Sequence, residues 1–246
     1  MTFFKAVLSG IVQGITEFLP VSSSGHLVIL HKLIGFEGPE LAFDLFLHIG
    51  TVISIAIVFW RELVDVVTLR NRIGGLIILA TLSTAVFVFI FGNRIEVVFT
   101  NVKLVGAMLM LTGIWLLLGN YLRFGSEGLS GFKAVVIGLA QGIAALPGIS
   151  RSGATISTAL FLGVDFRSAA KFSFILAVPT IIGAFLVKIK DMSFQGVNIY
   201  YFIGLITSCI VGVLSLKLLL RVLYKNKFHV FGVYCILMGI LVFLFL

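Results

Sequence analysis

Residues 13–26 read Gln-Gly-Ile-Thr-Glu-Phe-Leu-Pro-Val-Ser-Ser-Ser-Gly-His, and apolar segments flank this run on both sides. The run combines a carboxylate, a row of three serines and an imidazole with a helix-breaking proline. Burying such groups in an apolar protein is costly unless they find partners or water. The run therefore predicts a broken helical element that carries a functional site.

A second run with related features follows later in the chain. Residues 141–155 read Gln-Gly-Ile-Ala-Ala-Leu-Pro-Gly-Ile-Ser-Arg-Ser-Gly-Ala-Thr. Residues 141–143 repeat residues 13–15, and the Ser-x-Ser-Gly of residues 150–153 repeats that of residues 22–25 at the same spacing. Two polar, Gly- and Pro-interrupted segments in corresponding halves indicate an internal repeat with a site near the membrane midplane.

The composition indicates a membrane protein. Of the 246 residues, 60% are hydrophobic and 11% are charged, which is more apolar surface than a soluble core can bury. The net charge of +8 is then expected to mark topology and contacts with anionic lipid headgroups, so membrane lipids are predicted partners and nucleic acid is not.

Hydropathy predicts an all-α polytopic membrane protein, because lipid offers the backbone no hydrogen-bond partners. Six segments have the roughly 20 apolar residues that a spanning helix needs, at about 41–60, 74–92, 101–122, 168–187, 198–220 and 229–246. The remaining regions, about 2–35 and 131–163, are predicted to be re-entrant helical hairpins broken near Pro20 and Pro147.

Three predicted spans separate the two hairpins, an odd number, so the hairpins should enter the membrane from opposite faces as an inverted repeat. We expect a single membrane domain, 1–246, with halves of about 1–122 and 123–246. Eleven Lys and Arg residues fall on the face that holds residues 61–73 and six on the other, with Arg151 set aside. The positive-inside rule makes the first face cytoplasmic, so the first hairpin opens to the outside.

Arg151 stands at the predicted tip of the second hairpin, between two serines. A guanidinium at this position is suited to clamp a phosphate or carboxylate. A structural pair with Glu17 is the alternative, and the two roles are compatible. The surrounding residues fit a loop that leads into an anion-binding helix N-terminus, or simply a capped helix start. The candidate substrate-binding residues are these, Gly148, Ser150, Ser152, Gly153 and Thr155, together with Ser22 and Ser24 of the first run.

Gln13 and Glu17 are four residues apart and therefore share one helical face. This pair could bind a divalent cation through oxygen, or Glu17 could act as a base. One carboxylate makes a sparse metal site, so we expect the phosphates of a substrate to complete the shell, as they commonly do for Mg²⁺.

Three serines, at positions 22 to 24, include a candidate nucleophile, and His26 is close enough to serve as its base or acid. His26 could instead be the nucleophile, and any one of Ser22, Ser23 and Ser24 could merely cap a helix. Asp44 and His48 form another pair four residues apart, suited either to support the site or to make a helix-packing hydrogen bond.

The two runs, residues 13–26 and 147–155, resemble the signatures of the bacterial undecaprenyl-diphosphate phosphatase, or bacitracin-resistance, family. The resemblance implies removal of the terminal phosphate from undecaprenyl diphosphate, a polyprenyl diphosphate lipid, which recycles the carrier for peptidoglycan synthesis and confers bacitracin resistance. It also implies a multi-pass protein of the bacterial plasma membrane, with its site open to the periplasmic or extracellular side.

The resemblance assigns roles to matching positions. Ser23 matches the proposed nucleophile, His26 the motif histidine, Arg151 the phosphate-binding arginine, and Glu17 with Gln13 the polar pair that is linked to a divalent cation, Mg²⁺ or Ca²⁺. Some members have Glu where this chain has Gln13, which weakens the assignment of that position as a metal ligand.

Other functions fit parts of the pattern. An inverted-repeat transporter or polyprenyl-phosphate flippase would also place facing hairpins at the midplane. An intramembrane protease that uses Ser23 and His26 leaves Arg151 and the glycine-rich second run unexplained. A homodimer is left open by the sequence.

Overall fold

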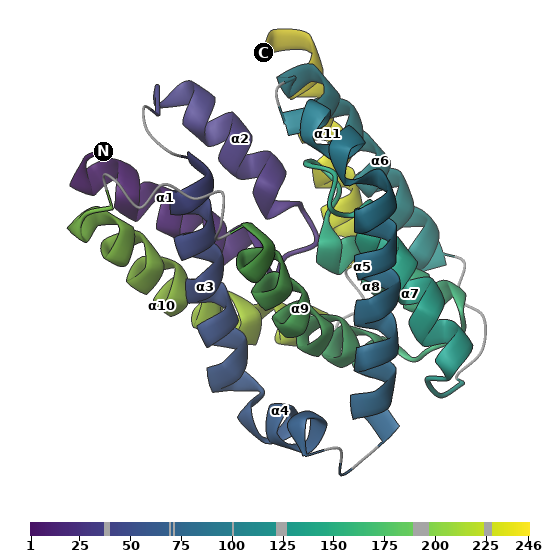
Figure 1. Ribbon diagram of the computed structural model, residues 1–246. Helices are drawn as coiled ribbons and strands as arrows, with labels where there is room; N and C mark the ends of the chain where they lie inside the picture. Colours follow the sequence, from purple (N-terminus) through teal and green to yellow (C-terminus); the bar gives the residue numbers. More distant parts are fainter. Residues whose placement is uncertain are drawn as a thin grey trace.

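The computed structural model describes residues 1–36, 40–68, 70, 72–99, 101–121, 127–188, 197–223 and 228–246. Helices are the regular secondary structure of this part of the chain, apart from one isolated bridge between Glu127 and Val164, which confirms the predicted all-α class. The helices, shown in Figure 1, are α1 Phe3–Thr16, α2 Ser23–Leu33, α3 Glu40–Val58, α4 Trp60–Val67, α5 Arg72–Phe99, α6 Val102–Tyr121, α7 Gly131–Ile143, α8 Arg151–Phe161, α9 Phe166–Lys188, α10 Ile199–Leu223 and α11 Phe228–Phe245.

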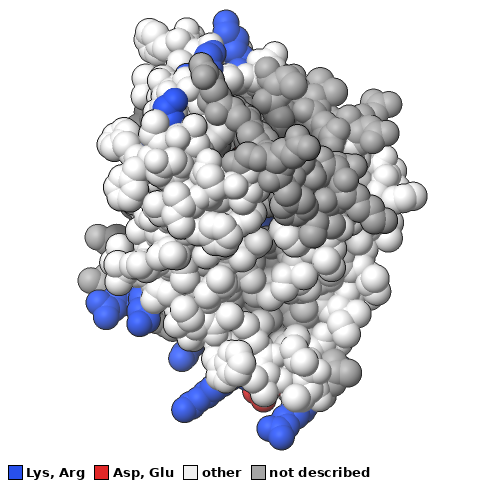
Figure 2. Space-filling view, turned by 60° about the vertical axis from the view of Figure 1, so that its left-hand side comes forward, with Lys and Arg blue, Asp and Glu red and all other residues white. Residues whose placement is uncertain are grey.

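Five of the described helices, α5, α6, α9, α10 and α11, are long and apolar enough to cross a membrane. The pair α3 and α4, bent by 93° after Val58, makes a sixth candidate. Their outer faces carry large apolar side chains such as Phe89, which is 92% exposed. Lys and Arg side chains gather at two opposite ends of the molecule, and a broad band of uncharged side chains separates them on the face in Figure 2. This distribution is typical of a multi-pass membrane protein.

Each of the two polar runs forms a helical hairpin. Residues 17–22 separate α1 from α2, residues 144–150 separate α7 from α8, and the helices of each pair contact each other. The open end of the first hairpin is closed by Lys5 Nζ, which donates to Gly35 O at 2.7 Å. The open end of the second is closed by the Glu127 N–H, which donates to Gly163 O at 2.6 Å.

The two hairpins enter the bundle from opposite ends, as the odd number of spans predicts. His31, near the open end of the first hairpin, lies 3.8 Å from Asp44 in the early part of α3. Beyond the far end of α3, Glu62 of α4 pairs at 3.1 Å with Lys171 of α9, the helix that follows the second hairpin. A helix of 19 residues such as α3 is roughly 28 Å long, so the two open ends are separated by about the thickness of a membrane core.

The hairpins interlock the first and second parts of the chain. Helix α1 packs on α10, and α7 packs on α5. Glycines allow both close approaches, since a Cβ at Gly10 would lie 2.7 Å from Thr207 Cβ and one at Gly138 would lie 2.2 Å from Ala80 O. Gly10 of the first hairpin and Gly138 of the second occupy equivalent positions of the repeat. The sequence analysis missed this correspondence. The division of the chain near residue 122 stays a prediction.

Candidate active site

The tips of the two hairpins meet at the carboxylate of Glu17, which is only 6% exposed. Ser23 Oγ donates to Glu17 Oε2 at 2.5 Å, and Gln13 Nε2 donates to the same oxygen at 3.0 Å. From the other hairpin, Arg151 Nη2 donates to Glu17 Oε1 at 2.6 Å. A buried carboxylate requires such partners to offset its lost hydration. The structure therefore brings three of the four predicted catalytic residues, Glu17, Ser23 and Arg151, together with Gln13.

Helix ends position these side chains. Gln13 lies in the last turn of α1 and Glu17 is its C-cap, whereas Ser23 and Arg151 are the first residues of α2 and α8. Each of these two helices begins with the repeated Ser-x-Ser-Gly, in which the first serine is the N-cap. The cap fixes the direction of the helix start. It thereby directs the residue at position x toward Glu17.

The two tips are also tied directly to each other. Ser22 Oγ accepts the N–H of Gly25 at 3.3 Å, as a cap does, and also the N–H of Gly148 at 3.1 Å. Ser22 has φ 68°, a left-handed conformation that costs roughly 1–3 kcal/mol for a residue other than glycine. This strain lies directly before Ser23. The contact between the tips is therefore made by the residue that immediately precedes the candidate nucleophile.

The second tip is held by a similar set of internal hydrogen bonds. Ser150 Oγ accepts the N–H of Gly153 at 3.1 Å, and Thr112 Oγ1 bridges the second tip by donating to Gly148 O at 2.7 Å and accepting the N–H of Ser150 at 3.0 Å. Gly148 has φ 95°, and a Cβ there would lie 2.5 Å from Val105 O. Sequence reasoning missed Thr112, because its contact comes from α6, a helix distant in the chain.

The remaining predicted substrate-binding residues make mostly internal contacts. Ser152 Oγ donates to Leu19 O at 3.4 Å, and Thr155 Oγ1 donates to Arg151 O at 2.8 Å and lies 2.6 Å from Ser173 Oγ. Ser24 is partly buried, with its hydroxyl 3.4 Å from that of Ser22. These contacts fit the capped helix start that the sequence left as an alternative. Direct binding of an anion by these groups stays a prediction.

His26 lies beside the site but does not hydrogen-bond to Ser23. Its Nδ1 is 2.8 Å from Ser22 O, and its Nε2 is 2.8 Å from the hydroxyl of Tyr234, whose ring stacks on the imidazole. A carbonyl only accepts, so Nδ1 carries the proton and Nε2 accepts from Tyr234. The described partner of the Ser23 hydroxyl is thus Glu17. Tyr234 was not predicted, because it is an isolated tyrosine in an apolar helix.

The side chains of the predicted pair, Asp44 and His48, each face a different neighbour. His48 Nε2 lies 3.6 Å from Glu17 Oε2, whereas Asp44 Oδ1 lies 3.8 Å from His31 Nε2. His48 Nδ1 is 2.7 Å from the backbone oxygen of Asp44, one turn earlier in α3. His48 therefore adds a fourth helix, α3, to the surroundings of the carboxylate, after α1, α2 and α8.

Two buried atoms of the site have no hydrogen-bond partner among the described residues: Arg151 Nη1 and Gln13 Oε1. The first leaves the guanidinium a free donor for an anion, and the second leaves an oxygen suited to a cation. In the described part of the chain, no three His, Cys, Asp or Glu side chains form a metal cluster. A cation held at Glu17 and Gln13 would therefore need further ligands of another kind.

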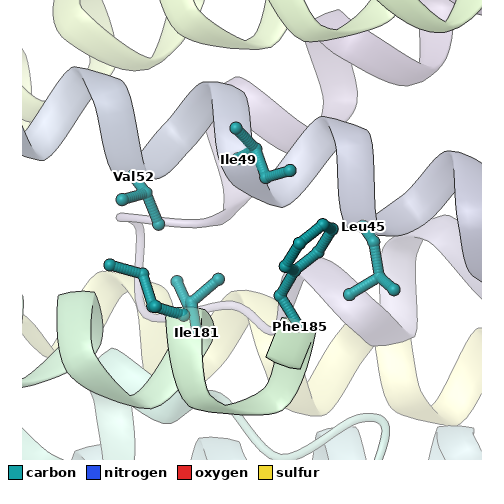
Figure 3. A pocket seen from close by; sticks show the side chains of 6 residues that line it. Leu45, Ile49, Val52, Ile181 and Phe185 are labelled. Carbon is teal, nitrogen blue, oxygen red and sulfur yellow. The ribbon is translucent and has the colours of Figure 1, made fainter. Parts of the chain in front are cut away.

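An apolar groove lies between α3 and α9 (Figure 3). Side chains from both helices point into it, and its volume is about 230 Å³. The α3 side belongs to the same stretch as His48, so the groove runs beside the helix that reaches the buried carboxylate. Its lining residues are Leu45, Ile49, Val52, Ile181, Ile182 and Phe185.

Comparison with known proteins gives a consistent result. Residues 6–241 match the family described as bacitracin resistance protein BacA. The chain is 39% identical to an undecaprenyl-diphosphatase of Halothermothrix orenii and 38% identical to one of Desulforapulum autotrophicum, in each case over 98% of this chain and 97% of the relative. A protein of the same name from Methanosphaera stadtmanae is 35% identical over the same shares. The chain belongs to the bacitracin resistance protein BacA family.

Proposed function

We propose that this protein hydrolyses undecaprenyl diphosphate to undecaprenyl phosphate and inorganic phosphate. Its family and the names of its relatives support this activity. The observation that carries the proposal is the meeting of the Ser23 hydroxyl and the Arg151 guanidinium on the buried carboxylate of Glu17. This activity recycles the lipid carrier for peptidoglycan synthesis and underlies bacitracin resistance.

The hydroxyl of Ser23 is the nucleophile in this proposal. Its oxygen attacks the terminal phosphorus, its proton passes to Glu17 Oε2, and the bond from that phosphorus to the bridging oxygen breaks, which releases undecaprenyl phosphate. The 2.5 Å hydrogen bond already aligns the proton with its acceptor. Water then attacks the phosphorus of the phosphoserine, the bond from that phosphorus to Ser23 Oγ breaks, Glu17 Oε2 returns its proton to Oγ, and inorganic phosphate leaves. His26 Nε2 accepts the proton of that water once the Tyr234 hydroxyl no longer donates to it.

Arg151 offsets the charge that develops on the transferred phosphoryl group. Its Nη2 remains on Glu17, while the free Nη1 donates to an equatorial phosphate oxygen. Donors fixed in advance within a dry site need little reorganisation during the reaction, so they stabilise the transition state strongly. The internal contacts of Ser150, Ser152 and Thr155 hold the start of α8 in place for this purpose.

A divalent cation, Mg²⁺ or Ca²⁺, completes the proposed site. The carboxylate of Glu17 and the unpartnered Oε1 of Gln13 fit oxygen-preferring cations, with phosphate oxygens of the substrate as further ligands. When bound, the cation would neutralise negative charge on the diphosphate and orient it.

The prenyl chain is proposed to lie along the apolar groove between α3 and α9 (Figure 3). The groove is smaller than the roughly 300–1,000 Å³ pockets that enclose drug-sized ligands, so it holds a short length of the chain and leaves the rest in lipid. The charge distribution supports a site that opens to the outer face of the plasma membrane.

The direct test uses purified protein in detergent with a prenyl diphosphate and Mg²⁺. Release of inorganic phosphate, abolished in Arg151→Ala, is the expected result. No release by the parent protein, together with movement of intact polyprenyl phosphate across vesicles, would support a flippase and overturn the proposal. A phosphorylated intermediate that is lost in Ser23→Ala assigns the nucleophile, whereas one lost in His26→Ala and kept in Ser23→Ala assigns it to the imidazole.

A further inference from the structure

The orientation of the His48 ring determines which of its nitrogens faces the site. Nδ1 lies 2.7 Å from the backbone oxygen of Asp44. Because a carbonyl oxygen can only accept, Nδ1 carries the hydrogen in the neutral ring. The lone pair is therefore on Nε2, the nitrogen that points toward Glu17.

The gap between His48 and Glu17 has the dimensions of a shared ion. Nε2 lies 3.6 Å from Oε2 of Glu17, beyond the range of an N–H···O hydrogen bond. When the imidazole is neutral, both of these atoms are acceptors. Two acceptors that face each other with no hydrogen between them repel. Donors of one cation lie about 2.0–2.2 Å from it, so two of them are roughly 3–4 Å apart. A cation between the two atoms would turn the repulsion into attraction.

Gln13 provides the independent observation. Its side chain is fully buried, and its Oε1 has no hydrogen-bond partner within the described part of the chain. Its Nε2 donates to the same Oε2 of Glu17 that His48 faces. A half-turn of the amide would place Oε1 beside Oε2 and free the lone pair that Nε2 occupies. The buried orphan oxygen would thereby become a third ligand at the same point.

We infer that His48 Nε2, Glu17 Oε2 and Gln13 Oε1 together bind a divalent cation, with the imidazole as a nitrogen ligand. The inference deepens the proposed function and rests on it for the role of the cation. Imidazole ligands favour ions such as Zn²⁺, Fe²⁺ and Ni²⁺, whereas carboxylate and carbonyl oxygens suit Mg²⁺, Ca²⁺ and Mn²⁺. With its imidazole, the site of this chain therefore prefers Zn²⁺ to Ca²⁺, and Mn²⁺ serves as the spectroscopic probe. Arg151 keeps its place on Oε1, the other oxygen of Glu17.

The competing arrangement is an ion pair between a doubly protonated His48 and Glu17. In that form Nε2 carries a hydrogen and has no lone pair for a metal. The two arrangements differ in one measurable property, the presence of a nitrogen nucleus in the first coordination shell of the bound ion.

The experiment is pulsed electron paramagnetic resonance of Mn²⁺ bound to the full chain in detergent, without substrate and without a polyhistidine tag. The parent protein should show coupling to one ¹⁴N nucleus. His48→Gln should lose this coupling and bind Mn²⁺ at least ~10-fold more weakly, while elution as a single species and an unchanged far-ultraviolet circular dichroism spectrum show that it is folded. His229→Gln removes an imidazole from the first turn of α11, where the neighbouring Phe228 packs on Phe166, and should keep both the coupling and the affinity.

Coupling that survives in His48→Gln, or that disappears in His26→Gln instead, would overturn the assignment of His48. So would Mn²⁺ affinities within twofold of each other in the parent, His48→Gln and His48→Leu. These outcomes are separate from failure of the proposed function, which is the absence of phosphate release from a prenyl diphosphate with any divalent cation. The nitrogen ligand is therefore tested even if the substrate is a different one.

Discussion

The two hairpin tips share a scaffold and differ in chemistry. Both use a serine cap whose hydroxyl accepts the N–H three residues later, at 3.3 Å in the first tip and 3.1 Å in the second. At the position between the two serines, however, the first tip has Ser23 and the second has Arg151. A repeated backbone motif thus delivers a hydroxyl from one side and a guanidinium from the other. The scaffold is repeated, and the reactive groups are divided between the copies.

The acid of the site occurs in only one copy. At the spacing of the repeat, Glu17 corresponds to Ala145 and His26 to Ala154. A second carboxylate at the tip would place like charges in an apolar interior and leave one of them without a cation. One buried carboxylate matched by one guanidinium avoids this cost. The asymmetry therefore follows from the electrostatics of a buried site.

The backbones of the tips differ as well. Ser22 has φ 68°, whereas Ser150, the equivalent cap, has φ −73° in the ordinary extended region. The difference accompanies the extra hydrogen bond that Ser22 accepts from Gly148 of the opposite tip. The strained cap thus belongs to the tip that holds the candidate nucleophile.

Loss of the Ser23 hydroxyl, the reactive group of the first tip, should have the largest effect on the rate of phosphate release. In Ser23→Ala the rate of phosphate release should fall roughly 10⁴- to 10⁶-fold, as for other enzymes that lose their nucleophile. The measurement is release of inorganic phosphate from a prenyl diphosphate. Ser9→Ala, at a buried serine of the same hairpin outside the site, should retain the parent rate. A loss of less than about tenfold in Ser23→Ala would remove Ser23 from its role.

Replacement of the Arg151 guanidinium, the reactive group of the second tip, should have the second-largest effect on this rate. Arg151→Lys keeps the charge but loses the second nitrogen, so it cannot hold Glu17 and a phosphate oxygen at once. The rate should fall about 10³-fold. Arg167→Lys, at the start of α9, is the matched control. Equal rates in Arg151→Lys and the parent would show that a positive charge at this position is enough for catalysis and that the second nitrogen is not needed.

Gly148→Ala should act on stability. Its φ of 95° and the 2.5 Å separation of a new Cβ from Val105 O leave no room for a side chain. The free energy of unfolding should fall by about 2–4 kcal/mol, measured by reversible unfolding in mixed micelles. Gly131→Ala, where a Cβ would meet only Leu79 Cδ2 at 3.6 Å, is the control and should unfold like the parent.

The two caps should give the smallest and most informative difference. Ser150→Ala should lower the free energy of unfolding by about 1 kcal/mol, the usual cost of a lost N-cap. Ser22→Ala should lower both stability and the rate of phosphate release, because it also cuts the link to Gly148. If both variants change the rate equally, the link between the tips does not orient Ser23.

Much of the fold was predictable because lipid leaves the backbone few choices. The length and apolarity of the spans predict helices, and Pro20 and Pro147 mark the two broken segments. The bend of 93° after Val58 was not predicted, because α4 has only eight residues and mixes charged with apolar side chains.

The principal site residues were predictable because polar groups stand out in an apolar chain. Gln13, Glu17, Ser23 and Arg151 were selected on that ground and lie together. Tyr234 and Thr112 were not selected, since single hydroxyls within apolar helices are common and usually bond to their own backbone.

The sequence by itself determined the class of the protein, the positions of both broken hairpins and the polar residues that carry the chemistry, because hydropathy and repeated motifs are local properties. Only the tertiary structure decided that Ser23 bonds to Glu17 rather than to His26, and that His48 faces the same carboxylate. These pairings depend on how helices from distant parts of the chain pack. Packing of that kind is set by side-chain shape across interfaces, which no spacing along the chain records.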